Sequence, residues 1–516
     1  MGGPLMSIKF STWLKVSTVI AVGAGFTATP AFADDYTDLL NILRAKGSLT
    51  QNEYSALMAK HGTGSRAARG RTARAAQTDA GADAQAAAAS AAASAAAAQA
   101  AAQSAQSSLQ ASNIIRSKPY VPGKGITIRA GDIDLNFSGF VNGYYTYSAG
   151  AVGSGVVGGG LAQPNRDNSA IRGGLLPAAL IFKASTTQAG IDMSAVFGIY
   201  PGINSSNTGT QFGANGGGSA YGLSTSGIDF RQVYVTAGTK KFGTVKVGRD
   251  LGIFGSDAIL SDATLLGVGA SGGNAMPGNT ALGRIGIGYV YADWLPQISY
   301  ASPTFGGVQI TVGAMSPYSV TNAFSGQPGV TGSSSDTLMF QGKVTYDYAF
   351  GPVTGRMWSS FLVQPQQKLQ GIVGANTRDS VLSAAIDGGI KANYGPFGMV
   401  GYYYRGSGLG TTGIFFDAIA ANGRKRDSEG YYVQGTYNVT KKLKLVASYG
   451  QSNLNQAPGE INPDLIRTNE AAMGGVYYSL TDWMTLVGEY AYVQSKSHGD
   501  TALHSNNFTA GTMLFF

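Results

Sequence analysis

From Ile126 to the last residue, apolar and polar side chains alternate with a period of two through one segment after another. In residues 134–147, for example, Leu135 and Tyr145 share an apolar face, while most positions of the opposite face are polar. This period is typical of β-strands with two different faces. It fits either a soluble sandwich or a membrane barrel with a wet interior. The same split recurs at residues 340–348, 382–394 and 431–439.

The lengths of the connections decide between a sandwich and a barrel, because short and long connections alternate without exception. This alternation predicts sixteen antiparallel strands in an outer-membrane barrel whose two ends lie on the periplasmic side. Residues 285–293 also resemble a strand, which leaves eighteen strands as the alternative, but parity assigns them to the third long loop. The short connections lie near residues 188, 240, 305, 351, 396, 441 and 482, and the long ones at 148–173, 202–226, 254–294, 319–335, 366–379, 406–427, 454–467 and 497–503.

The third long loop, about residues 254–294, is the candidate functional element. It follows a hairpin whose strands, 230–238 and 242–248, are joined by the polar turn Thr239-Lys240-Lys241. An irregular segment of this length is usually functional or disordered. Inside a barrel such a loop can fold inward, so we expect it to narrow the lumen as a constriction loop.

Opposed charges at a constriction select solutes by sign and size. For Arg231 and Arg356 the facing stays open, since a β-bulge would turn either residue to the other face. Alternation places five basic and five acidic side chains in the lumen, and this balance predicts neither anion nor cation preference. These are Lys183, Lys246, Lys343, Lys391 and Lys444 against Asp134, Asp192, Asp347, Asp387 and Glu489. The pore and constriction candidates are Arg249, Asp250, Asp257, Asp262, Arg284, Lys246, Lys343, Asp347, Asp387 and Lys391.

The N-terminus predicts export. Residues 1–33 combine a basic lead, the apolar run Val16 to Phe26 and the small-residue cleavage site Ala31-Phe32-Ala33, which are the three parts of a cleaved signal peptide. The start is either Met1 or Met6. No later segment reaches the length of a spanning helix. The export signal and the barrel pattern together predict the cell outer membrane, with lipid around the barrel.

Between the signal and the barrel lies a predicted periplasmic arm. Residues 34–61 have the spacing and the capping box of a helical hairpin. Residues 62–125 join an arginine-rich linker to an alanine-rich segment. Alanine favours helix but buries little surface, so a coiled coil is expected, and a homotrimer is plausible. Contact of the arginines with anionic polymers of the cell wall is the alternative to a solvated linker.

Composition excludes several classes of function. Charged residues are 12% of the chain, there is no cysteine, and glycine occurs 75 times. Residues 126–516 carry 24 basic and 22 acidic side chains, so the basic balance does not indicate nucleic-acid binding. The three histidines are scattered and no nucleophile elbow or phosphate-binding loop is present, so we expect no metal, no cofactor and no catalytic site. An outer-membrane barrel hydrolase and a structural tether remain the alternatives to a channel.

Two stretches resemble a known family. RQVYVTAGTKKFGTVKVGRD (231–250) resembles the hairpin before the constriction loop of Gram-negative general porins, and ISYASPTFGGVQITVGA (298–314) resembles the segment after it. The terminal Phe516 is similar to the family's C-terminal assembly signal. The resemblance implies a passive channel for small hydrophilic solutes or ions. The N-terminal arm looks more like dicarboxylate-type and phosphate-selective porins, which are trimers, and this implies the alternative of a channel selective for anions or dicarboxylates.

Overall fold

The computed structural model of the protein describes residue 55, residue 90 and residues 92–104, 115–152, 155–162, 167–204, 228–271, 280–322, 325–334, 336–373 and 379–516. These fall into two compact units, before and after residue 112. In the first unit, residues 92–104 are helical with exposed side chains. No helix among the described residues is long and apolar enough to span a bilayer. The predicted signal peptide (1–33) and, apart from residue 55, the helical hairpin (34–61) lie outside the described residues.

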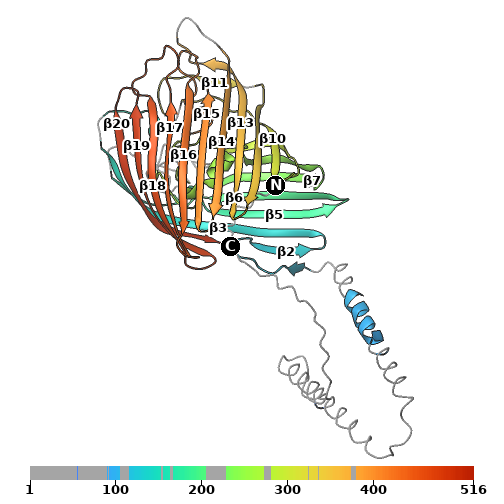
Figure 1. Ribbon diagram of the computed structural model, residues 1–516. Helices are drawn as coiled ribbons and strands as arrows, with labels where there is room; N and C mark the ends of the chain where they lie inside the picture. The colour runs from blue at the N-terminus through green and yellow to red at the C-terminus, as the bar shows by residue number, and fades with distance from the viewer. Residues whose placement is uncertain are drawn as a thin grey trace, which may run out of the picture. The chain divides into compact units, whose positions relative to one another are not determined.

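The second unit is a closed antiparallel β-barrel (Figure 1). Each strand pairs with the next, and β20 pairs with β3, which closes the wall. Of the twenty strand segments among the described residues, β4 and β5 form one interrupted strand and β1, β2 and β11 are short additions, so the wall has sixteen strands. The predicted number is confirmed. The wall consists of β3 (Ile133–Val152), β4 (Asn168–Arg172), β5 (Ala179–Gln188), β6 (Ile191–Pro201), β7 (Ile228–Thr239), β8 (Gly243–Leu251), β9 (Trp294–Ala301), β10 (Val308–Met315), β12 (Met339–Phe350), β13 (Val353–Gln370), β14 (Val381–Tyr394), β15 (Phe397–Ser407), β16 (Asp427–Asn438), β17 (Leu443–Leu454), β18 (Ile466–Ser479), β19 (Met484–Ser497) and β20 (Ala502–Phe515).

The three additional strands were not predicted. β1 (Ile115–Ser117) and β2 (Ile126–Ala130) form a hairpin, and β2 pairs with the first residues of β3. The sheet therefore begins at Ile115, inside the segment 62–125 that the sequence assigns to linker and coil. β11 (Thr331–Ser334) pairs with β13 within a long loop. Strands of three to five residues are too short to show a period.

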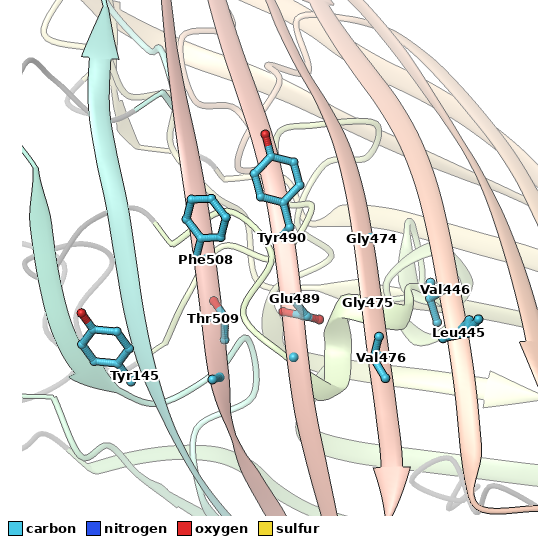
Figure 2. A pocket seen from close by; sticks show the side chains of 12 residues that line it. Tyr145, Leu445, Val446, Gly474, Gly475, Val476, Glu489, Tyr490, Phe508 and Thr509 are labelled. Carbon is cyan, nitrogen blue, oxygen red and sulfur yellow. The ribbon is translucent and has the colours of Figure 1, made fainter.

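Neighbouring side chains of the wall point to opposite faces. Figure 2 shows this on β19 and β20, where Tyr490 and Phe508 lie on the outer face with ring centroids 5.1 Å apart. Phe508 is 49% exposed, whereas the next residue, Thr509, is 6% exposed on the inner face. Gly474 and Gly488 leave an apolar concavity of about 700 Å³ beside these rings. Because exposed apolar surface is unfavourable in water, the outer face is suited to lipid.

The described part of the third long loop is largely buried inside the barrel. Its described residues, 252–271 and 280–293, contain the helix α4 (Ser256–Ser261) and the 3₁₀ helix η1 (Ala263–Leu266). Phe254 and Ile287 are completely buried, and Phe415 from the loop at 408–426 joins the same core. Residues 285–293 form only isolated bridges, so their assignment to the loop rather than to a further strand is confirmed.

Candidate channel constriction

The constriction loop is anchored where it leaves the wall. On β8 the Lys246 ammonium is paired with the Asp250 carboxylate on the lumen side. The backbone N–H groups of Ile253 and Phe254 then donate to the Gln341 side-chain oxygen at 2.7 and 2.9 Å. Gly255 has a φ of 73° before α4, a backbone conformation that favours glycine. The loop therefore turns inward over β12.

Two carboxylates of the wall, one on β14 and one on β19, hold the loop. Asp387 accepts from the Gly255 N–H at 3.0 Å, and also from the Tyr402 hydroxyl at 3.0 Å. Glu489 accepts from the N–H groups of Val268 and Gly269 at 2.7 and 3.0 Å. Hydrogen bonds to an ionised acceptor are roughly twice as strong as neutral ones. These two lumen acids are therefore engaged by the loop backbone.

The third anchor is an ionic network around α4. Asp257 pairs with Lys343 at 2.6 Å and with Arg356 at 3.3 Å, and Arg356 pairs with Asp347 at 2.6 Å. Burial by itself raises the pKa of Asp257, but the positive charges of Lys343 and Arg356 outweigh it and leave the net pKa below its usual value. Arg356 therefore faces the lumen, which answers the question that alternation left open.

The remaining candidates of the loop are structural. The Asp262 carboxylate accepts from the Thr264 N–H at 3.0 Å, where it caps η1, and from the Tyr289 hydroxyl at 2.8 Å. Arg284 is fully buried, donates to the Ser448 hydroxyl on β17, and stacks over the Tyr432 ring on β16 at 5.7 Å. Both side chains stabilise the loop rather than line a passage.

The strand register decides the facing of two arginines. Arg249 is the cross-strand partner of Val233, whose side chain is exposed on the outer face. The structure thus does not bring the predicted constriction residue Arg249 into the lumen. Between β6 and β7 the register shifts at Gly198, and Arg231 is the extra residue. This is the kind of bulge that leaves facing undetermined from sequence, and here Arg231 pairs with Asp229 at 3.1 Å.

Two lysines of the lumen wall near the short turns have no acidic partner among the described residues. Lys391 on β14 lies directly across from Arg356 on β13, and Lys391 is also close enough to Lys444 on β17 for their charges to interact. Among the described residues neither Lys391 nor Lys444 forms an ion pair, and Lys444 lies 4.8 Å from the centre of the Tyr477 ring. These cations face the lumen without compensation.

Sequence reasoning missed several residues that hold the loops. Gln434 receives the Ala263 N–H at 2.8 Å, and buried Arg172 donates to the carbonyls of Ser271 and Thr280 at 2.5 Å each. Further out, Arg426 is fully buried in an ion pair with Glu460. The partners lie far apart in the chain, and no local motif marks them.

This geometry, an inward loop tied to the wall by charged groups, matches the outcome of the family comparison. The model of Gram-negative porins matches residues 86–498. The chain belongs to the Gram-negative porin family. It is therefore an outer-membrane diffusion channel, and the resemblance seen in its hairpins is confirmed.

The chain is similar to solved structures of outer-membrane channels. The outer membrane channel DcaP of Acinetobacter baumannii has 16% sequence identity, covers 74% of this chain and 97% of its own, and has a TM-score of 0.54. The anion-selective porin from Comamonas acidovorans covers 74% of this porin and 100% of its own chain at 14% identity and a TM-score of 0.46. At 16% identity the likeness to DcaP establishes the fold of the porin alone. No curated protein sequence matches the chain significantly.

Proposed function

We propose that this porin prefers anions among the small hydrophilic solutes that it passes. The supporting observation is how the lumen charges are used. Asp387 and Glu489 accept hydrogen bonds from the constriction loop, while Lys391 and Lys444 lack ion pairs within the described part of the chain. The formal balance of five acids and five bases is thus not a balance of available charge.

The position of the lysines supports this proposal. Lys391 lies directly across from Arg356 on the lumen wall, and its charge also acts on Lys444. Like charges that interact raise each other's energy unless an anion approaches. In a passage lined this way, an entering anion is stabilised and an entering cation is repelled.

The test is the reversal potential of the purified porin in planar bilayers under a tenfold KCl gradient. We expect the sign of anion preference in the wild type and a shift toward zero in the double variant Lys391→Gln, Lys444→Gln. The matched control is Lys441→Gln in the exposed turn between β16 and β17, which removes a charge outside the lumen and should leave the potential unchanged. A cation-selective wild type, or equal shifts in both variants, would contradict the proposal.

We further propose that residues 1–33 are removed on export and that the arm in the periplasm supports a homotrimer. The helix at 92–104 exposes all its side chains, which are mostly alanine, and such a helix becomes stable by packing against copies of itself. Deletion of 34–112 should leave a conducting barrel whose trimer dissociates more readily in detergent, as measured by native mass spectrometry. A deletion variant that stays as firmly trimeric as the full chain would contradict this role.

A further inference from the structure

A second polar site lies away from the constriction, at the end of the barrel that carries the short turns. It is a cavity of about 370 Å³ on the lumen side of β3 and β5–β8, completed by Arg129 of the β1–β2 hairpin. This volume falls in the lower part of the range for small-molecule sites. None of the predicted constriction residues borders this cavity.

The strand register arranges the floor of the cavity in rows. Asp134 on β3 lies across from Ser185 on β5, Ser185 across from Ser194 on β6, and Ser194 across from Thr236 on β7. These side chains form one continuous polar row, in which the hydroxyls of Ser194 and Thr236 are 2.7 Å apart. The floor thus offers donors and acceptors but no aromatic ring.

One cation and one carboxylate flank this row on opposite sides. Lys183 lies two residues before Ser185 on β5, and Asp192 lies two residues before Ser194 on β6, opposite Thr187. Four residues of strand, about 13 Å, separate the rows of Lys183 and Asp192. The long lysine side chain can shorten this distance.

Lys183 and Asp192 are available to a ligand, and so is Asp132 in the lining of the cavity, which forms no ion pair among the described residues. Asp134 is engaged by Lys118 at 2.6 Å and by Arg129 at 3.5 Å. Lys183 has no ion pair among the described residues, and the only described partner of Asp192 is the Thr187 hydroxyl, which donates to one oxygen at 2.6 Å. A ligand therefore meets one free positive group, Lys183, two free carboxylates, Asp192 and Asp132, and the hydroxyls between Lys183 and Asp192.

We propose that this cavity is a binding subsite for zwitterionic solutes of the size of an amino acid or dipeptide. The solute carboxylate pairs with Lys183, its ammonium pairs with Asp192, and the hydroxyl row receives its amide groups. A dianion would find a single free cation here, and a sugar would find no ring to stack on. The contacts are few and wet, so binding is weak enough for release, as conduction requires.

The test measures uptake into liposomes that contain the full-length porin, with three solutes of matched size. Glycylglycine carries both charges, N-acetylglycylglycine only the carboxylate, and glycylglycinamide only the ammonium. We expect uptake of glycylglycine to saturate at millimolar concentration. Lys183→Met and Asp192→Asn should each slow its uptake at low concentration about threefold, the factor of one solvent-exposed ion pair.

The single-charge solutes separate a binding subsite from a general effect on the pore. Lys183→Met should not slow glycylglycinamide, and Asp192→Asn should not slow N-acetylglycylglycine. Lys441→Met is the matched control, and circular dichroism verifies that each variant keeps its β-sheet. Uptake of glycylglycine that rises linearly with concentration, or a variant that slows all three solutes equally, overturns the subsite. Either result would leave the anion preference measured by reversal potential untouched, so the two proposals fail separately.

Discussion

The lumen of this porin has two parts that follow the same two-residue alternation yet differ in kind. Toward the long loops, inward side chains meet the constriction loop and the loop at 408–426, and Ile287 and Phe415 have no exposed surface. Toward the short turns, Lys391 and Asp192 meet water. In the first part acids such as Asp387 bind the protein itself, and in the second, charges such as Lys391 and Asp192 stay available for solutes.

This difference shows that the role of a charged side chain in the lumen depends on whether other residues cover it. Asp387 and Lys391 lie on the same face of β14, four residues apart. Asp387 is 4% exposed and is held by the loop at Gly255, whereas Lys391 lies beyond the loop. A count of lumen charges therefore describes the passage poorly.

The largest expected effect on stability comes from the part toward the long loops, at the buried pair of Arg426 and Glu460. Arg426 also donates to the Pro328 carbonyl at 2.9 Å and thereby joins three loops. Arg426→Ala leaves a buried carboxylate without its partner, and we expect a loss of about 3–5 kcal/mol in the free energy of unfolding. The measurement is a urea titration in detergent.

Arg467→Ala is the control for this prediction, because the pair of Arg467 with Asp500 spans 3.2 Å but has side chains 43% and 84% exposed. It should cost less than about 1 kcal/mol. Equal losses in Arg426→Ala and Arg467→Ala would mean that the loops are not packed as described.

Next in size is Asp387→Ala, which removes the acceptor for Gly255 and Tyr402. Loss of a hydrogen bond to a charged group costs about 1.5–3 kcal/mol. We expect lower stability and, because the loop is released, larger current fluctuations in single-channel recordings. Asp347→Ala, whose carboxylate is half exposed, should lower stability by no more than about 1 kcal/mol. Unchanged current noise in Asp387→Ala would show that this carboxylate does not hold the loop.

A smaller effect is expected from Asp257→Asn at the border of the two parts. The substitution removes the negative charge shared by Lys343 and Arg356. Both cations then add to the field of the passage, so the ratio of chloride to potassium permeability should rise. The shift should be smaller than the opposite shift of the double variant Lys391→Gln, Lys444→Gln. An unchanged ratio would place Asp257 outside the path of ions.

The smallest effect is a dependence on pH within the loop at 408–426. Burial raises the pKa of Asp417 from 3.8 to about 6. A carboxyl group whose folded pKa is raised contributes stability at low pH, and that contribution is lost as pH rises from about 4 through about 6. The thermal midpoint of the wild type should therefore fall more between pH 5 and pH 7 than that of Asp417→Asn. Asparagine tolerates the φ of 56° at this position. Identical pH profiles would refute the shift.

The sequence predicted the barrel because the lipid outside and the polar lumen inside impose the same two-residue alternation on every strand. Phe140 and Tyr144 are apolar but fall on the polar face by alternation, and both are 1% exposed inside the barrel. Val141 and Tyr145 fall on the other face and are 52% and 51% exposed. The facing of each strand follows from a local pattern that repeats many times along the chain. The number of strands and their facing can therefore be predicted from the sequence.

The candidate site was less predictable because its contacts join distant parts of the chain. The hydrogen bond from the Gly255 N–H to the Asp387 carboxylate joins residues 132 positions apart, and no local sequence motif near either residue predicts it. A single bulge decides the facing of Arg231. The list of lumen charges could thus be written from the sequence, but not which charges the loop engages.

The most direct test of the difference between the two parts uses single cysteines, since the chain contains none of its own. Lys391→Cys and Ile287→Cys are each exposed to a negatively charged methanethiosulfonate reagent during single-channel recording. We predict a rapid stepwise fall in current for Lys391→Cys and no reaction for Ile287→Cys while the protein is folded. A reactive Ile287→Cys together with an inert Lys391→Cys would contradict the claim that the loop closes one part of the lumen and leaves the lysines in the path of solutes.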